Sequence, residues 1–212
     1  DRVEITSTDP GFPRDAAAWC NSTGNQLISK EATGGKSVVV IEKGEPKSCN
    51  IVTSCEGKGK TFIMFSDDLD KALATFVLAN GAAATGQKVT IFFTFWGLNV
   101  IKKLHKPNVE KDIFGKMFGM MLPSSSRKLK LSKMSMGGIG GKMMRYIMNR
   151  KGIDSLESLR QQALENGVEF IACQMSMDVM GVKQEELLDE VTIGGVATYM
   201  ERADNANINL FI

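Results

Sequence analysis

The sequence is poor in the side chains that most hydrolases use for acid–base chemistry and zinc binding. It has a single histidine, His105, and four cysteines, Cys20, Cys49, Cys55 and Cys173, among 212 residues. One histidine leaves little support for a zinc hydrolase or a Ser–His–Asp triad. Four cysteines are too few for a disulfide-stapled secreted fold, and the spacing of Cys49 and Cys55 is not that of a CxxC motif.

Long apolar runs are also missing. The longest strongly apolar stretch, residues 89–101, is too short to span a bilayer as a helix. No signal peptide is recognisable, and the first residue is Asp1 rather than Met, so we expect the sequence to begin inside a longer protein. These features predict a cytoplasmic protein that meets a membrane, if at all, at the membrane surface.

Charge of one sign is concentrated in a single segment. Residues 102–151 contain thirteen Lys and Arg residues and only two acids, Glu110 and Asp112, whereas the whole chain has a net charge of +2. A segment of about +11 is therefore embedded in a remainder of about −9. This asymmetry indicates an anionic partner or surface.

The first 45 residues predict a small, partial α+β unit. Residues 3–6 and 37–41 have strand-like patterns, and residues 13–28, which begin with a proline and contain three successive alanines, predict a helix between them. This part is too short to enclose a full core. Residues 46–59 are rich in turn formers and predict a linker.

The remainder, residues 60–212, alternates strand and helix patterns. We predict strands at 61–65, 89–95, 168–172 and 207–212, and helices at 69–85, 155–166, 184–190 and 193–204. This alternation predicts βαβ units and a parallel sheet with flanking helices. The expected fold class is therefore α/β, with the basic segment at about 102–151 inserted between the second and third strands.

Cys173 is the candidate reactive residue because it directly follows the third predicted strand. Open parallel sheets bind ligands beyond the carboxyl ends of their strands. A thiol there can meet backbone N–H groups and a helix N-terminus, which favour the thiolate, and the thiolate is the nucleophile of sulfur transfer. The alternative is a small buried hydrophobic side chain, as most free cysteines are.

Four further residues are candidates for substrate binding. Asp67 follows the first strand, and Trp96 and Gly97 follow the second, so all three should lie at the same edge of the sheet; Ser176 lies just after Cys173. For Asp67 the alternative is a helix cap, and for Trp96 it is a core aromatic.

Methionine is strongly clustered, with eleven of the thirteen between residues 117 and 180. Residues 137–141 are glycine-rich and precede Lys142, but their spacing does not match a phosphate-binding GxxxxGK[ST] loop. One interpretation is a Cu(I) site built from thioethers. The other is a flexible basic surface that adapts to a partner or lies on an anionic membrane.

Five segments match, in order, the motifs of a known family. They are FSDDLDKALA at 65–74, ANGA at 79–82, FFTFWGL at 92–98, ACQMSMDVMG at 172–181 and GGVATY at 194–199. These segments resemble the DsrE/DsrF-like family in its Met-rich branch. The resemblance covers residues 60–212. It implies a flavodoxin-like parallel sheet, frequent oligomerisation and persulfide chemistry, with the family's cysteine falling on Cys173.

The first 43 residues resemble the back part of a TusA-like (SirA-like) sulfur carrier, at 8–10, 15–20, 24–29 and 38–43. The CPxP motif that carries sulfur in such domains is absent, as are the first strand and helix. This part is therefore not expected to carry sulfur, and Cys20 is expected to be structural. Such modules occur fused behind flavin-dependent disulfide reductase and rhodanese domains, which implies that this chain is the C-terminal part of a similar fusion.

Together these features predict a sulfurtransferase or persulfide carrier that accepts sulfane sulfur at Cys173. The expected partners are sulfur donor and acceptor proteins or low-molecular-weight thiols, together with further copies of the chain; no nucleic acid, metal or resident cofactor is expected. The alternative is a non-catalytic assembly or membrane-docking module that acts through the basic insert.

Overall fold

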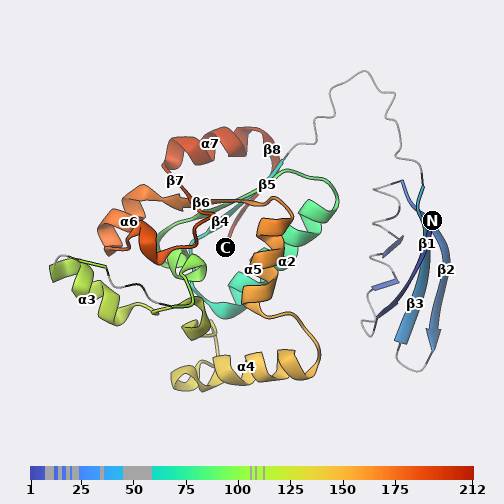
Figure 1. Cartoon of the computed structure of the whole chain (residues 1–212), viewed down its shortest axis with the longest axis horizontal. Helices are drawn as coiled ribbons and strands as arrows, with labels where there is room; N and C mark the ends of the chain where they lie inside the picture. Colours follow the sequence, from blue (N-terminus) through green and yellow to red (C-terminus); the bar gives the residue numbers. More distant parts are fainter. Residues whose placement is uncertain are drawn as a thin grey trace. The chain divides into compact units, whose positions relative to one another are not determined.

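The computed structural model describes residues 1–7, 12–13, 16–17, 20, 24–33, 36–44, 59–105, 107, 109–111 and 113–212. The chain divides into two compact units, Asp1–Glu56 and Gly57–Ile212 (Figure 1). Most of the predicted linker, residues 46–58, lies outside the described residues.

The first unit contains a three-stranded antiparallel sheet. Its strands are β1 (Arg2–Ser7), β2 (Gln26–Thr33) and β3 (Lys36–Glu42), in the order β1-β3-β2. The strands predicted at 3–6 and 37–41 are confirmed. Val39 and Ile41 pack against Ala16 and Cys20 in a small core. Burial raises the pKa of the Cys20 thiol, which keeps it protonated and suits a packing role.

The helix predicted at 13–28 is wrong in its second half. Residues 12, 13, 16, 17 and 20 are helical, but residues 26–28 belong to strand β2. Gly24 lies between the two, with a φ of +81° that other residues rarely adopt. Pairing with β3 supplies the backbone hydrogen bonds of 26–33 and overrides the weak helical preference of this segment.

The second unit is built on a five-stranded sheet in the order β7-β6-β5-β4-β8. The strands are β4 (Gly59–Met64), β5 (Val89–Phe93), β6 (Glu169–Cys173), β7 (Thr192–Gly194) and β8 (Ala206–Phe211). All four strand pairs are parallel. The predicted parallel α/β sheet is confirmed.

The helices of this unit are α2 (Leu69–Ala84), α3 (Ile113–Met121), α4 (Ile139–Arg150), α5 (Leu156–Glu165), α6 (Gln174–Met180) and α7 (Val196–Asp204), with 3₁₀ turns η1 (Phe95–Ile101), η2 (Ser126–Lys128), η3 (Met136–Gly138) and η4 (Gln184–Glu186). The helices predicted at 69–85 and 155–166 are confirmed, whereas the helix predicted at 184–190 is only a 3₁₀ turn at its start, and α6 and the helices of the insert were not predicted. Ser155 caps α5, as its Oγ accepts a hydrogen bond from the Ser158 amide at 3.1 Å. The helix predicted at 193–204 starts only at Val196, because residues 192–194 form the short edge strand β7.

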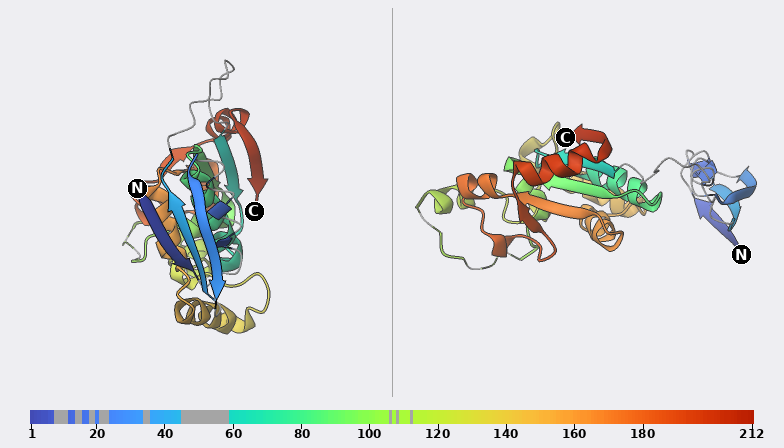
Figure 2. Two further views of the ribbon diagram at one scale, coloured as in Figure 1. Left: turned by 90° about the vertical axis from the view of Figure 1, so that its right-hand side faces the viewer. Right: turned by 90° about the horizontal axis from the view of Figure 1, so that it is seen from above.

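Helices cover both faces of the sheet, as expected for a flavodoxin-like fold. Helices α2 and α5 lie on one face and α7 on the other (Figures 1 and 2). On the α2 face, the rings of Phe76, Phe93 and Phe170 form a cluster with centroid separations of 5.3 to 6.4 Å. On the α7 face, Phe92 packs against Tyr199. Neighbouring residues of β5 therefore serve opposite layers of the core.

The aromatic cluster yields a stability prediction. Phe76→Ala should lower the free energy of unfolding by about 3–5 kcal/mol, because the cavity cannot close against two large rings. Val77→Ala on the same helix, where the side chain is 56% exposed, should change it by about 0.5 kcal/mol or less. Urea unfolding followed by far-UV circular dichroism measures both, and equal losses would contradict the assigned core.

Candidate functional site

Three neighbouring strands bring Cys173 to the carboxyl edge of the sheet. Met64 of β4 aligns with Phe93 of β5, and Phe93 aligns with Ala172 of β6. Phe65 and Thr94, which directly follow β4 and β5, therefore lie at the same level as Cys173, the last residue of β6. On the other side of β6, Cys173 pairs with Gly194.

The Cys173 thiol is buried. Its residue is 1% exposed and packs with Phe92, Ile171 and Tyr199 on the α7 face. Cys173 is the N-cap residue of α6, but its side chain makes no hydrogen bond to that helix. The expected contact between the thiol and the helix N-terminus is therefore not made, because alternation along β6 directs Cys173, like Ile171, toward the α7 face.

Ser176 lies within the core of the second unit. It is fully buried, and its hydroxyl shares a hydrogen bond of 2.8 Å with the hydroxyl of Thr94. This bond ties the first turn of α6 to the end of β5. Ser176 thereby holds in place the helix that follows Cys173.

Gly97 allows a close approach between η1 and β4. A Cβ atom at this position would lie 1.9 Å from the carbonyl oxygen of Met64, and the Gly97 amide donates a 2.8 Å hydrogen bond to the Phe65 carbonyl. Phe95, which opens the turn, has a φ of +46°, an uncommon conformation for a bulky residue. The turn is thus held tightly against β4 while it carries Trp96 to the surface.

Asp67 and Trp96 line one cleft of about 590 Å³, which neither Cys173 nor Ser176 reaches. The opposite wall comes from the end of α3 and the segment after it. The remaining lining residues are Gly119, Met120, Met121, Leu122, Pro123, Ser124, Lys128 and Lys130. Two of the predicted site residues are therefore brought together, in a cleft whose other wall is basic and rich in methionine.

The carboxyl group of Asp67 is held by the neighbouring turn. The Nδ2 atom of Asn99 donates a hydrogen bond of 3.0 Å to Asp67 Oδ2. Burial raises the pKa of Asp67, and this effect outweighs the lowering by Asn99 and by Lys102. Asp67 is not the cap of α2: Asp68 is the N-cap residue, and it forms an ion pair with Lys71 at 2.9 Å.

The insert is joined to the body beside Asp67, which the sequence analysis missed. The Leu69 amide donates to the Lys130 carbonyl at 2.7 Å, and the Ser132 amide donates to Asp70 Oδ1 at 2.9 Å. In the sequence, only the cluster of Lys and Arg residues in the insert pointed to this contact, because a basic segment can pack over the acidic loop around Asp67.

No cluster of three or more His, Cys, Asp or Glu side chains suited to a metal ion occurs among the described residues. The alternative of a methionine-based copper site stays a prediction. In the same part of the chain, none of the helices has the length and apolar character needed to cross a bilayer.

Residues 57–211 match the model of the DsrE/DsrF/DrsH-like family. The chain belongs to this family. The uncharacterized protein YrkE of Bacillus subtilis (strain 168) is 44% identical over 155 residues, which cover 73% of this chain and 97% of YrkE. The sulfur carrier protein DsrE2 of Allochromatium vinosum is 38% identical over 161 residues, which cover 74% of this chain and 99% of that protein. The solved structure of the ychN protein from E. coli covers 73% of this chain with 10% identity and a TM-score of 0.42.

The family match begins at residue 57 of this DsrE/DsrF/DrsH-like chain. The resemblance of residues 1–43 to a TusA-like carrier therefore stays a prediction.

Asp67 and Asp70 should respond to pH in opposite directions. Because the folded state holds the Asp67 proton more tightly than the unfolded state, the wild type should lose stability relative to Asp67→Asn as pH rises through and above about 3.9. For Asp70, hydrogen bonds from Ser132 outweigh burial and lower the pKa of the carboxyl group. Asp70→Asn should therefore become less stable than the wild type as pH rises toward about 3.9, the pKa of an aspartate in the unfolded chain. Urea unfolding across this pH range tests both, and the same sign for the two variants would contradict the assigned environments.

The contribution of the hydrogen bond between Ser176 and Thr94 to stability can be tested by a double-mutant cycle. Ser176→Ala leaves the buried Thr94 hydroxyl without its partner and should lower the free energy of unfolding by about 1–3 kcal/mol. Adding Thr94→Val removes the stranded hydroxyl, so the double variant should recover most of that loss. Additive losses in urea unfolding would show that the two hydroxyls do not depend on each other.

Proposed function

We propose that this chain accepts sulfane sulfur at Cys173 and passes it to an acceptor thiol, as one member of a sulfur relay. The observation that carries the proposal is a lone cysteine at the carboxyl end of β6, the edge at which parallel sheets bind their ligands. The sulfur carrier DsrE2, a relative matched over 99% of its length, supports the same chemistry.

The proposed transfer is an exchange at sulfur without net oxidation. The Cys173 thiolate attacks the outer sulfur of a donor persulfide, R–S–SH. A new S–S bond forms on Cys173, the S–S bond of the donor breaks, and the donor leaves as the thiolate R–S⁻. The same reaction in the opposite sense, with an acceptor thiolate attacking the persulfide on Cys173, releases the sulfur.

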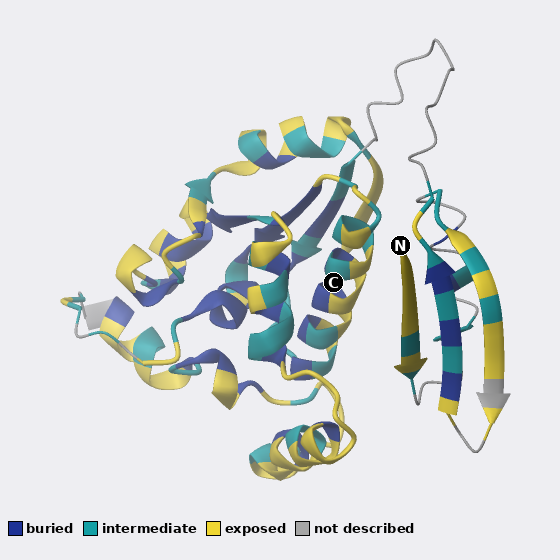
Figure 3. Cartoon of the chain, turned by 45° about the vertical axis from the view of Figure 1, so that its right-hand side comes forward, coloured by how far each residue is buried: buried dark blue, intermediate teal, exposed yellow. Residues whose placement is uncertain are grey.

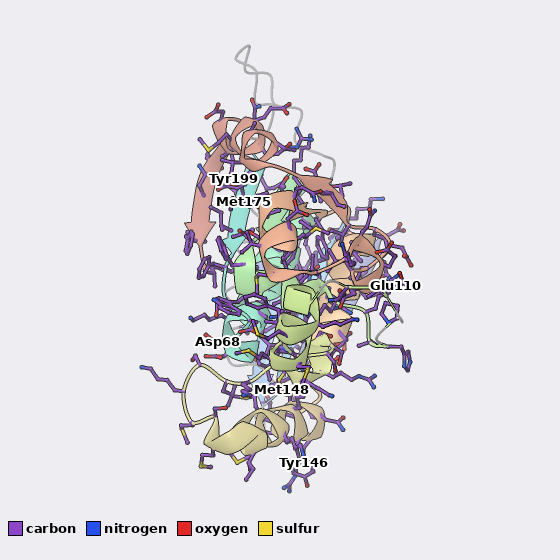
Figure 4. All side chains as sticks on the ribbon, turned by 90° about the vertical axis from the view of Figure 1, so that its left-hand side faces the viewer. Asp68, Glu110, Tyr146, Met148, Met175 and Tyr199 are labelled. Atoms are coloured by element: carbon purple, nitrogen blue, oxygen red, sulfur yellow. The ribbon has the colours of Figure 1, made fainter. Side chains whose placement is uncertain are left out.

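Transfer requires the buried thiol to become accessible. Helix α6, which follows Cys173, has only seven residues. Its outer side exposes Met175 and Val179, and Met175 is labelled beside the sheet edge in Figure 4. The ring that packs on the thiol is Tyr199 of α7, so we propose that a donor or acceptor protein binds beside α6 and displaces Tyr199 from Cys173.

When the donor or acceptor is a low-molecular-weight thiol compound, we propose that it binds in the cleft lined by Asp67 and Trp96. Gly97 and Ser176, which were expected to bind substrate, have supporting roles in this proposal. Oligomerisation, cytoplasmic location and an upstream fusion to disulfide reductase and rhodanese domains stay predictions.

The proposal is tested by sulfur uptake. A chain with Cys20→Ser, Cys49→Ser and Cys55→Ser retains only Cys173; incubated with thiosulfate and a rhodanese, it should gain the mass of one sulfur atom, which dithiothreitol then removes. The matched chain that also carries Cys173→Ser should gain none. Trp96→Ala, added to the Cys173-only chain, should slow uptake from a small persulfide without abolishing it.

Intact-mass spectrometry reads all three variants. If the wild type gains one sulfur and the single variant Cys173→Ser gains as much, the carrier thiol lies elsewhere. If no chain gains sulfur while Cys173 is alkylated rapidly, the thiol is accessible but does not accept sulfur, and the proposal fails.

A further inference from the structure

Helix α4 is apolar on two opposite sides. Its inner side packs on the body of the unit through Gly140, Gly141 and Met148, all of which are buried. The approach is close: a Cβ atom on Gly141 would lie 3.2 Å from the Leu129 carbonyl oxygen. The core therefore already occupies one side of the helix, and the apolar residues on the other side must have a different purpose.

The outer side carries Ile139, Met143, Tyr146 and Ile147, which we call the α4 stripe. All four are exposed, and Tyr146 reaches 65%. Their spacing of four, three and one residues places them on one side of a helix. Figure 3 shows the outer side of this helix in the colour of exposed residues, and Figure 4 shows Tyr146 on the far side of α4 from the body.

Two further exposed methionines precede α4 in the chain. Met134 and Met136 are 70% and 60% exposed, and both have a positive φ, of 57° and 40°. Positive φ is unfavourable for residues other than glycine. The backbone is therefore held in a strained conformation that turns two flexible apolar side chains outward.

The charge around the stripe has one sign. No Asp or Glu occurs from residue 113 to residue 153. The exposed cations of this stretch are Lys116, Arg127, Lys128, Lys130, Lys133, Lys142, Arg150 and Lys151. A second copy of the chain would bring the same cations against this surface, so like charges oppose self-association here. The surface is complementary to an anionic partner.

We propose that the α4 stripe inserts into the surface of an anionic phospholipid bilayer. An exposed apolar stripe flanked by Lys and Arg is the pattern of a helix that lies in the plane of the membrane interface. The long Lys and Arg side chains can reach the headgroups while the stripe enters the acyl boundary. Tyr146 would lie at headgroup level, where its ring meets apolar atoms and its hydroxyl meets water.

The test is flotation of the full chain with vesicles. It should float with vesicles of phosphatidylcholine and phosphatidylglycerol but not with phosphatidylcholine alone, and salt should weaken binding. Lys142→Ala and Arg150→Ala should each lower the partition coefficient about fivefold. Ile139→Ser with Met143→Ser should abolish flotation. Val77→Ser on α2, at a site that is equally exposed, is the matched control and should have no effect.

Several outcomes would overturn the proposal. These are no flotation, equal binding to neutral vesicles, and binding that the stripe variants leave unchanged. If Met143→Ser instead dissociates a dimer in sedimentation velocity, the occupant is a second copy. If the chain binds polyglutamate but not vesicles, the occupant is an acidic protein. Should the double serine variant fail to fold by circular dichroism, Lys142→Glu, which keeps the stripe intact, decides the question.

Discussion

The register of the parallel sheet determines where every candidate functional group of the second unit lies. Because Met64, Phe93 and Ala172 align across three strands, the chain leaves β4, β5 and β6 at one level. The loop with Asp67, the turn with Trp96 and the helix after Cys173 therefore start side by side. A slip of one residue in β6 would turn Cys173 toward the α2 face and place Ala172 toward α7.

This arrangement sets two demands on Cys173 that oppose each other. Packing against Phe92, Ile171 and Tyr199 protects a thiol from solvent and from unwanted oxidation. A relay, however, needs the sulfur to reach a partner. The proposed relay resolves this conflict if Tyr199 of α7, which packs on the thiol, can move aside. The hydroxyl bond between Ser176 and Thr94 meanwhile holds the start of α6, directly after Cys173, against the end of β5.

The sequence predicts the structure where local pattern decides it. The apolar runs of β4, β5 and β6 and the capped helix α5 have clear signals, and the position of Cys173 at a strand end followed from them. The direction of its side chain did not follow, because a parallel strand is apolar on both faces and its pattern does not reveal which residues face which layer. Residues 26–28 were assigned to a helix because their strand pairing with β3 involves residues more than ten positions away.

The helices within the insert and its packing on the unit escaped prediction for a different reason. Its glycines and methionines do not form a conventional amphipathic pattern, since α4 buries glycine and exposes Ile139 and Met143. The insert contacts the N-terminus of α2 through the hydrogen bond from the Leu69 amide to the Lys130 carbonyl. No sequence pattern links residues so far apart. The run of cations indicated that the insert has a binding partner. It did not show that the insert also packs on the rest of the same unit.

The close contact between α6 and α3 connects the cysteine with the insert. Gly181 ends α6 with a φ of +62°, and a Cβ atom there would lie 2.5 Å from the Cα of Gly115 in α3. Two glycines at the contact leave no side chain that could yield, so any displacement of α6 must move α3 or separate from it. Since α3 also forms a wall of the cleft that holds Asp67 and Trp96, a movement of α6 would reshape that cleft.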